Sequence, residues 1–550
     1  MKNAKPYFAY RTWSIAARSS WKVFDETVDR ALKEAPRHGI NCIEIQDYNG
    51  SWIDCVARYR RPPKLLSMAM YRGGEAKRRD TAARYRAAAR KIRRAGYELQ
   101  VWYHCFRDWP REVFDAYSEL RDADGQAVYD LLSDTFRDAF DFFPEITGVT
   151  VTSLHETPSI LRFGGRTSQA DRMERLYRAI LKPCEEKKRR FILRDFIGVQ
   201  SQFDDFSQVV DRLPDSVVLQ TKDVLADWSS HEKPVNPFII RYAAKSKKLI
   251  VEFDLANNFA GELELPWCDP EQIWRRTRLL AELNVHGVVG RLVNSHAVTA
   301  GTIFDTPNEV NVWAFSRYAV DPGRLLKAPA DCWARDYDQF DASVWIDWAR
   351  LRYGPKAAVP VIELLQKTPR LVNLTLNLCG GYFMLLRYHN PGQPREDWKH
   401  KLATGYGEIA SSIRAIRRCG PDLARAEKAE AMRIVTESLR RIEKLKRVMP
   451  RAGYENVHGA FLRARCLVGI YRALAEALIV ALEVDAGRSR KPALAKATAA
   501  LRRAARTTIA AYGDELYEGV PRGALAAAEF LDELPGRVDQ ILGHQVEIVP

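Results

Sequence analysis

The first part of the chain repeats one unit of hydrophobic patterning. Each unit has a short apolar run rich in β-branched or aromatic residues, then a polar loop, then a longer amphipathic stretch. Short apolar runs predict buried strands, whereas apolar positions three and four residues apart predict helices. Eight runs predict eight strands, at residues 7–14, 41–46, 97–105, 148–156, 190–197, 216–222, 248–255 and 285–293.

Helical patterns separate these predicted strands. One is DETVDRALKEAPRHG (25–39), where Gly39 is expected to end the helix, and another begins at Asp269 with Pro270, a typical N-cap and first-turn pair. Strict alternation of strands and helices predicts a parallel sheet, and eight units in about 320 residues predict that it closes. The predicted fold is therefore α/β, a (β/α)8 TIM barrel over residues 1–325.

The strand pattern stops after residue 325. From residue 341 onward the chain reads as a series of amphipathic helices, so residues 326–550 are predicted to form an all-α C-terminal domain. Its apolar faces are expected to pack on the barrel, on one another or on a second copy of the chain. A homodimer through this domain is thus one expected assembly.

The composition is that of a folded protein. Hydrophobic residues make up 46% of the 550 residues, charged residues 28%, and the chain holds 13 Trp and 22 Tyr, which excludes a disordered chain. Nine scattered cysteines without a paired spacing fit a reducing compartment better than a disulfide framework. The sequence has neither an apolar leader nor a run of eighteen apolar residues, so we expect a cytoplasmic protein with no membrane partner.

The chain carries an excess of positive charge. Its net charge of +15 admits an anionic partner. Part of the excess lies in KRRDTAARYRAAARKIRRAGY (77–97), where Arg and Ala recur at helical spacing. Such a segment is typical of the solvated face of an outer helix, so we expect no nucleic-acid partner.

Reactive groups of TIM barrels come from the C-terminal ends of the strands and the loops that follow. These positions hold carboxylates, cationic side chains, histidines and tryptophans. In strand order they are Arg11 and Trp13; Glu44 and Asp47; Trp102, Tyr103 and His104; His155 and Glu156; Arg194 and Asp195; Lys222, Asp223, Asp227 and Trp228; Glu252, Asp254 and Asn258; Arg291 and Asn294.

Such a set of side chains suits a sugar. Tryptophan faces stack on pyranose rings, carboxylates bind hydroxyls or transfer protons, and Arg or Lys holds an anionic group. Glycoside hydrolysis needs one protonated carboxyl and one ionised carboxylate on opposite sides of the scissile bond. Glu156 is a candidate for the acid, and the acidic residues of the sixth and seventh predicted strands are candidates for the other role.

The run from the fourth to the eighth predicted strand resembles the catalytic core of glycoside hydrolase family 67, the α-glucuronidases. Glu156 in TSLHETPS takes the place of the acid in that family's Lys-Ala-(Asp/Asn)-Ser-Glu-Gly motif, and Arg194 in FILRDFI matches the arginine of its Trp-Arg-Cys-Phe-Val pattern. KDVLADWSSHEKP has the length of a lysine-to-proline segment of the family. VEFDLANNFAG, LVNSHAVTAGTIFDTPNEVNVWAFSRYAVDP and WARLRYGPKAAVPVIELLQKT extend the resemblance into the helical domain.

The resemblance implies roles for several residues. It makes Glu156 the general acid, Asp227 the base and Lys222 a substrate-binding cation, while Asn258 stands where the family has a second base carboxylate. The first predicted strand begins within ten residues of Met1, so the family's N-terminal β-sandwich is not expected. The full expected set comprises catalytic Glu156, Asp227 and Glu252 and substrate-binding Lys222, Arg194, Asn258, Trp13, His155, Trp228 and Asn294.

The leading hypothesis is an inverting, exo-acting glycoside hydrolase that removes a uronic acid from an oligosaccharide, without cofactor or metal. Glu252 lies inside an apolar strand, so it is either paired with a barrel cation or reactive. A retaining enzyme with Glu156 as acid/base and Glu252 as nucleophile is therefore one alternative. A metal-dependent sugar isomerase or epimerase and a non-catalytic glycan-binding protein are the others. For Trp13, core packing is the alternative to sugar binding.

Overall fold

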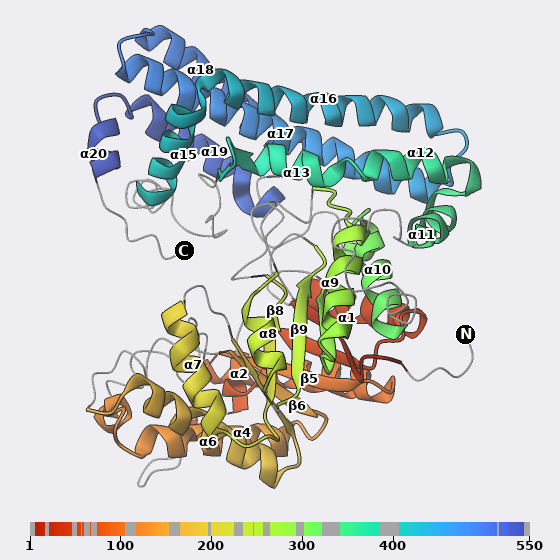
Figure 1. Cartoon of the computed structure of the whole chain (residues 1–550), viewed down its shortest axis with the longest axis vertical. Helices are drawn as coiled ribbons and strands as arrows, with labels where there is room; N and C mark the ends of the chain where they lie inside the picture. The colour runs from red at the N-terminus through yellow and green to blue at the C-terminus, as the bar shows by residue number, and fades with distance from the viewer. Residues whose placement is uncertain are drawn as a thin grey trace.

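The computed structural model confirms the predicted fold class. It describes residues 6–16, 21–46, 52–56, 58–59, 66–67, 74–104, 117–152, 166–195, 200–224, 235–245, 247–256, 265–292, 302–321, 342–383, 406–513 and 516–543. A closed barrel of eight parallel strands is followed by a layer of long helices (Figure 1). The predicted domain boundary at residues 325 and 326 lies outside the described residues.

Each of the eight predicted runs overlaps one barrel strand, and only β1 extends beyond its run, by two residues. In order around the barrel, the strands are β1 (Tyr10–Ala16), β2 (Cys42–Gln46), β5 (Glu98–Tyr103), β6 (Gly148–Thr152), β7 (Arg190–Arg194), β8 (Val218–Lys222), β9 (Leu249–Asp254) and β10 (Gly287–Arg291). Ser14 of β1 is paired in register with Glu44 of β2 on one side and with Arg291 of β10 on the other, which closes the barrel.

Helices surround the strands. They are α1 (Trp21–Glu34), α2 (Gly74–Arg94), α4 (Ala127–Phe142), α6 (Gln169–Glu186), α7 (Gln200–Arg212), α8 (Phe238–Ala243), α9 (Pro270–Glu282) and α10 (Glu309–Val320). The Asp269 side chain caps α9 by accepting from the Gln272 amide at 3.1 Å, as the sequence predicts. Helix α1 ends earlier than predicted, because Pro36 lies in a separate 3-10 turn before Gly39.

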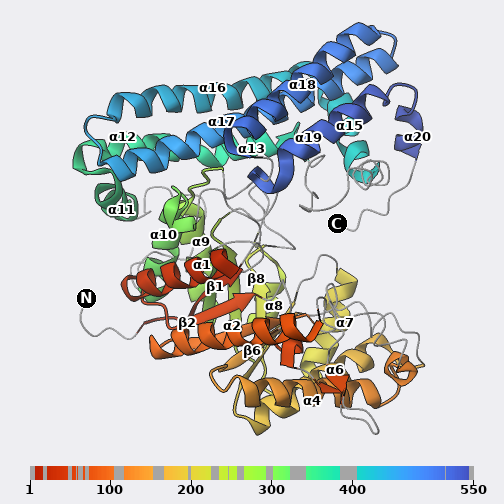
Figure 2. The ribbon, with the colours of Figure 1, turned by 180° about the vertical axis from the view of Figure 1, so that it is seen from behind.

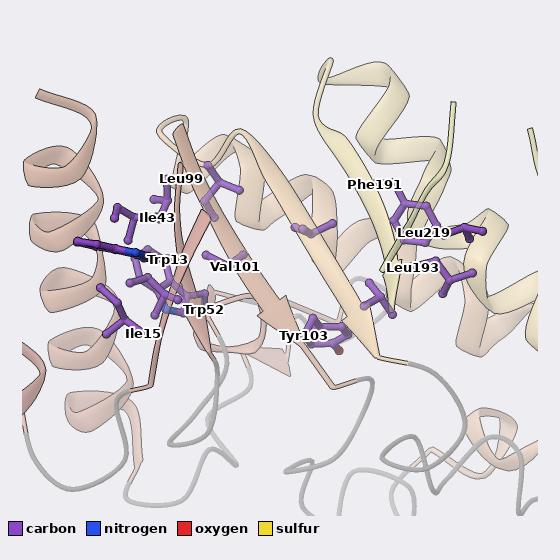
Figure 3. Close-up of a cluster of buried hydrophobic side chains, with 14 of the residues drawn as sticks. Trp13, Ile15, Ile43, Trp52, Leu99, Val101, Tyr103, Phe191, Leu193 and Leu219 are labelled. Atoms are coloured by element: carbon purple, nitrogen blue, oxygen red, sulfur yellow. The ribbon is translucent and has the colours of Figure 1, made fainter. Parts of the chain in front are cut away.

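The shell of helices packs on apolar side chains of the strands and exposes charged residues to solvent. The apolar side chains of alternate strand positions stand against the helices, as Figure 3 shows for Trp13, Ile15 and Ile43. Helix α2 buries Tyr85 and Ile92 in the core that it shares with the barrel, while most of its charged residues are exposed. The basic segment predicted as a solvated helix face is therefore an outer face of the barrel.

Where the structure describes it, the C-terminal part is helical apart from one hairpin. Its helices are α11 (Ser343–Tyr353), α12 (Pro355–Leu365), α13 (Thr368–Leu376), α15 (Tyr406–Cys419), α16 (Pro421–Leu445), α17 (Arg451–Asp485), α18 (Lys491–Tyr512), α19 (Leu516–Asp532) and α20 (Val538–Gly543). The hairpin consists of β11 (Asn377–Leu378) and β12 (Gly381–Tyr382), and a second short pair, β3 (Arg58–Tyr59) and β4 (Leu66–Ser67), lies in the barrel part. Neither pair was predicted, because two-residue strands show no alternation of apolar and polar residues.

The helical layer shares a hydrophobic core with the barrel. The barrel contributes Val224, Leu265, Trp267, Cys268 and Val310 to the same buried cluster as the interior of α11 to α19. Val224 follows β8, and Leu265, Trp267 and Cys268 follow β9, so these contacts lie beyond the C-terminal ends of the strands. The helical layer therefore lies over the end of the barrel where the site is expected (Figures 1 and 2).

Hydrogen bonds reinforce this junction. The Trp348 indole donates to Glu309 at 3.0 Å, the Trp345 indole donates to Glu271 at 2.9 Å, and the Arg352 guanidinium donates to the Phe304 carbonyl at 2.5 Å. The backbone amide of Cys268, in the barrel, donates to the Thr368 hydroxyl at the start of α13 at 3.0 Å. The last bond satisfies a buried amide that has no strand or helix partner of its own.

Thr368→Val is expected to lower the free energy of unfolding by about 1–3 kcal/mol, because it leaves the buried Cys268 amide without an acceptor. Thr375→Val is the matched control. Thr375 is equally buried in α13, but its hydroxyl bonds only the Leu371 carbonyl of its own helix. Urea denaturation of both variants measures the difference. Equal losses would contradict a specific role for the bond between the two parts.

Candidate active site

The barrel interior changes from apolar to charged along its axis. Near the N-terminal ends of the strands, six interior side chains form a small cluster: Tyr10, Cys42, Ile192, Val218, Ile250 and Val289. Because side chains alternate between faces with a period of two, the interior residues next along these strands are two positions later. All six are polar or charged: Thr12, Glu44, Arg194, Gln220, Glu252 and Arg291.

Glu252 is the centre of this polar layer and is fully buried. Arg194 makes a two-pronged bond with it, donating from Nε to Oε2 at 2.6 Å and from Nη2 to Oε1 at 3.0 Å. Gln220 donates to Oε2 at 3.0 Å, and Arg291 Nη1 lies 3.3 Å from Oε1. Each carboxylate oxygen of Glu252 thus has two partners.

A second carboxylate lies one step further toward the mouth. Oδ2 of Asp254 lies 2.7 Å from Nζ of Lys222, and Oδ1 of Asp254 accepts a hydrogen bond from Arg291 Nη1 at 3.0 Å. Arg291 also donates to Gln46 at 3.3 Å, and Gln46 in turn donates to the Ser14 hydroxyl at 2.9 Å. The ion pairs therefore continue as hydrogen bonds around to β2 and β1.

Trp102 of β5 completes this layer. The guanidinium carbon of Arg194 lies 4.5 Å from the centroid of the Trp102 ring, and that of Arg291 lies 5.6 Å from it. Both distances are within the range of cation–π attraction, which favours cationic groups beside an indole. Trp102 therefore helps to hold the two arginines in the geometry that engages Glu252.

The electrostatics of Glu252 follow from these contacts. Burial alone would raise its pKa, but the charges of Arg194, Arg291 and Lys222, together with the Arg194 hydrogen bonds, lower the pKa to about 2. Glu252 is therefore ionised at any physiological pH. A carboxylate of such low basicity, with both oxygens engaged, is a weak nucleophile and a weak proton acceptor.

The cations outnumber these two carboxylates. Arg194, Lys222 and Arg291 have side chains that are 2%, 2% and 4% exposed, and they face Glu252 and Asp254. A further carboxyl, Glu44, lies in the same polar interior, where burial raises its pKa to about 7. When Glu44 is protonated, the group of Arg194, Lys222, Arg291, Glu252, Asp254 and Glu44 carries one net positive charge. Such an environment favours an anionic ligand group.

The structure brings together three of the predicted site residues. Arg194, Lys222 and Glu252 belong to one network, as the pairing of Glu252 with barrel cations requires. Trp13 lies elsewhere: it is fully buried on the outer side of β1, with its ring 5.4 Å from Phe304 and 5.1 Å from His38. This position matches the packing alternative. The remaining residues lie outside the described residues: Glu156, Asp227, Asn258, His155, Trp228 and Asn294.

Other interior residues were not singled out from the sequence. Gln220 and Gln100 donate to Glu252 and Glu44, and Thr150 donates to Glu44. The two-residue period counted back from Lys222 and from Trp102 would have found the two glutamines. Thr150 carried no comparable signal, since its neighbours in β6 are small or apolar.

Two acidic candidates from the strand ends, Asp195 and Asp223, are buried carboxyls. Burial raises the pKa of Asp195 to about 6, although hydrogen bonds from Thr221 and Tyr242 oppose the shift. Burial also raises the pKa of Asp223 to about 6, while Arg276, 3.4 Å from its Oδ2, opposes the rise. Both side chains contact residues outside the central network.

Two further properties concern the described residues alone. None of their His, Cys, Asp and Glu side chains form a group of three or more that could hold a metal ion. None of their helices is both long enough and apolar enough to cross a membrane.

Comparisons with known proteins agree with the barrel architecture. A GH138 enzyme that targets pectin rhamnogalacturonan II superimposes with a TM-score of 0.59 at 10% identity, covering 98% of this chain and 69% of that one. A GH115 4-O-methyl-α-glucuronidase with specificity for decorated arabinogalactans gives a TM-score of 0.50 at 12% identity, covering 95% of this chain and 62% of that one. The chain spans about two thirds of these two enzymes.

No family model and no curated protein matches the sequence. The structural comparisons show that the chain has the fold of TIM-barrel glycoside hydrolases, one of which is an α-glucuronidase. At sequence identities of 10% and 12%, this similarity shows the fold alone. The resemblance seen in the sequence was to family 67. The two structures named above belong to families 138 and 115.

Proposed function

We propose that the protein is an inverting, exo-acting glycoside hydrolase that removes a uronic acid from an oligosaccharide. The observation that carries this proposal is the group of Arg194, Lys222 and Arg291 around two carboxylates at the C-terminal end of a glycoside hydrolase-like barrel. When Glu44 is protonated, three cations facing two carboxylates leave one positive charge to bind the carboxylate of a uronic acid. Arg offers a planar pair of donors suited to that group.

In the proposed reaction, Glu156 protonates the glycosidic oxygen as the bond to the anomeric carbon breaks. Asp227 takes a proton from a water that attacks the anomeric carbon from the opposite face. In the sequence, Glu156 comes four residues after the last residue of β6 and Asp227 five residues after the last residue of β8. Loops at these strand ends are where barrel enzymes hold their reactive groups.

Glu252 then has a supporting role. Its low pKa and its four hydrogen-bonding or ionic contacts suit a carboxylate that holds Arg194 and Arg291 in place for the substrate. The same properties argue against the retaining alternative, in which Glu252 would attack the anomeric carbon. The proposal therefore assigns Glu252 as a positioning residue.

The direct test is hydrolysis of aryl glucuronides and galacturonides, each beside its neutral hexoside, with the anomer of the first product followed by NMR. Release of a uronic acid with inverted configuration supports the proposal. Retention would favour the mechanism with Glu252 as nucleophile. Binding of uronates without turnover on an oligosaccharide panel would favour a glycan-binding protein.

Lys222→Met is expected to lower the preference for uronosides over neutral hexosides, measured as a ratio of kcat/KM values, by about 10- to 100-fold. A charge-assisted bond of about 1.5–3 kcal/mol accounts for that change. Lys247→Met is the matched control. Lys247 is also a buried lysine paired with an aspartate, Asp215, at 3.2 Å, but it precedes β9 and so lies at the opposite end of the barrel. An unchanged ratio in the Lys222 variant would contradict its assignment.

A further inference from the structure

Glu44 is a buried carboxyl that the proposed reaction does not use. It lies on β2, inside the barrel and fully shielded from solvent. Its Oε2 accepts from Gln100 Nε2 at 2.9 Å and from the Thr150 hydroxyl at 2.8 Å. These bonds come from neutral donors, unlike the bonds of Glu252, which come mainly from arginines.

The groups that face Glu44 from other strands come from β1, β5, β6 and β9. Ser14 of β1, Trp102 and Gln100 of β5, and Thr150 of β6 are neutral donors that favour its ionised form. Glu252 of β9 repels a negative charge on Glu44, and Tyr10 and Cys42 are the nearby titratable groups on the N-terminal side. Burial and Glu252 outweigh the donors, so the pKa of Glu44 is raised to about 7.

Two other buried carboxyls near the network, Asp195 and Asp223, have a pKa of about 6 and contact partners outside it, Thr221 and Tyr242 for Asp195 and Arg276 for Asp223. Among the six side chains of Glu44, Glu252, Asp254, Arg194, Lys222 and Arg291, the net charge at pH 7 depends on the proton of Glu44. With Glu44 ionised, the charges of Glu44, Glu252 and Asp254 balance those of Arg194, Lys222 and Arg291. With Glu44 protonated, one positive charge is left over. An anionic ligand that binds these cations adds a negative charge above Glu252 and competes for the cations that compensate it. Both effects make an ionised Glu44 less favourable.

We propose that Glu44 is a positioning residue that takes up a proton from solvent when an anionic sugar binds at Arg194, Lys222 and Arg291. This inference rests on the proposed uronate-binding function. In the bound state the protonated Glu44 keeps the interior neutral, so that Glu252 continues to hold the two arginines. In the free state Glu44 shares the role of counterion with Glu252 and Asp254.

By linkage, a ligand that binds together with a proton binds more tightly at lower pH. The Kd for a uronate is therefore expected to rise with pH above about 7, by at most about tenfold per pH unit, in line with uptake of at most one proton. A neutral sugar adds no charge, so its Kd is expected to change little over the same range.

The experiment is isothermal titration calorimetry of the full chain at pH 7 with glucuronate, galacturonate and neutral glucose. Buffers of different ionisation enthalpy give the number of protons taken up. We expect about 0.4 of a proton per uronate if binding raises the pKa of Glu44 by about one unit. We expect none for glucose and none for the uronates in the Glu44→Gln variant.

Thr150→Val provides a second variant. It removes a hydroxyl that donates to ionised Glu44, so the pH of maximal proton uptake is expected to move upward. Uronate binding without proton uptake, or equal uptake in Glu44→Gln, would overturn the role of Glu44 and leave the proposed function standing. An unmoved pH maximum in Thr150→Val would also overturn that role. Failure of every uronate to bind would overturn the proposed function itself.

Discussion

Arg194→Met is expected to lower the free energy of unfolding by about 3–5 kcal/mol, because it leaves Glu252 as a fully buried carboxylate without its two-pronged partner. In this variant Arg291 and Gln220 each keep one contact with Glu252, but neither makes a two-pronged bond with its carboxylate. Guanidinium denaturation at pH 7 measures the change. The same variant is expected to bind uronates weakly, since one of the three cations is lost.

Arg137→Met is the matched control for this prediction. Arg137 makes the same two-pronged bond with Glu186, at 2.7 and 3.0 Å, but both side chains are about a third exposed. Exposed pairs of this kind contribute about 1 kcal/mol or less. If the two methionine variants lose the same stability, the Arg194 pair is not the buried anchor that its geometry indicates.

Glu156→Gln is expected to lower kcat/KM by about 10²- to 10⁴-fold for uronosides with poor leaving groups, as loss of a general acid does. Aryl uronosides with an acidic phenol need little protonation, so their hydrolysis is expected to fall much less. The measurement is a plot of log kcat/KM against the pKa of the leaving group, which is expected to be steeper in the variant than in the wild type.

Asp227→Asn serves as the comparison for this prediction. A base that activates water is needed whatever the leaving group, so its loss is expected to lower both classes of substrate by similar factors. An unchanged slope in Glu156→Gln would contradict its role as the acid. Wild-type activity in both variants would remove both residues from the mechanism.

The barrel could be predicted because each strand is buried on both faces and so reads as an apolar run. The interior of the site was harder to predict for the same reason. In β1, the residues from Thr12 to Ile15 are all buried, whichever face they take, so polarity does not show which side Trp13 takes. Its parity with Ile15 places it against the helices, whereas Ser14 faces the barrel interior with Glu44.

The charged network could be predicted only in part. Arg194, Lys222 and Glu252 stood out as charges at the ends of apolar strands, and pairing is the physical requirement for burying them. The partners of each charge depend on register, which sets Lys222 beside Glu252 and Arg291 beside Asp254. Register follows from the closure of the whole barrel, and no local pattern encodes it.

The core shared by the barrel and the helical layer also bears on how the chain evolves. Leu265 and Trp267 are buried together with residues of α11 to α19. A recombination event that exchanged the helical part for an unrelated domain would expose these side chains to water beside the mouth of the barrel. We therefore expect the two parts to be inherited as one unit, with substitutions at Trp267 accompanied by compensating changes in α11 to α13.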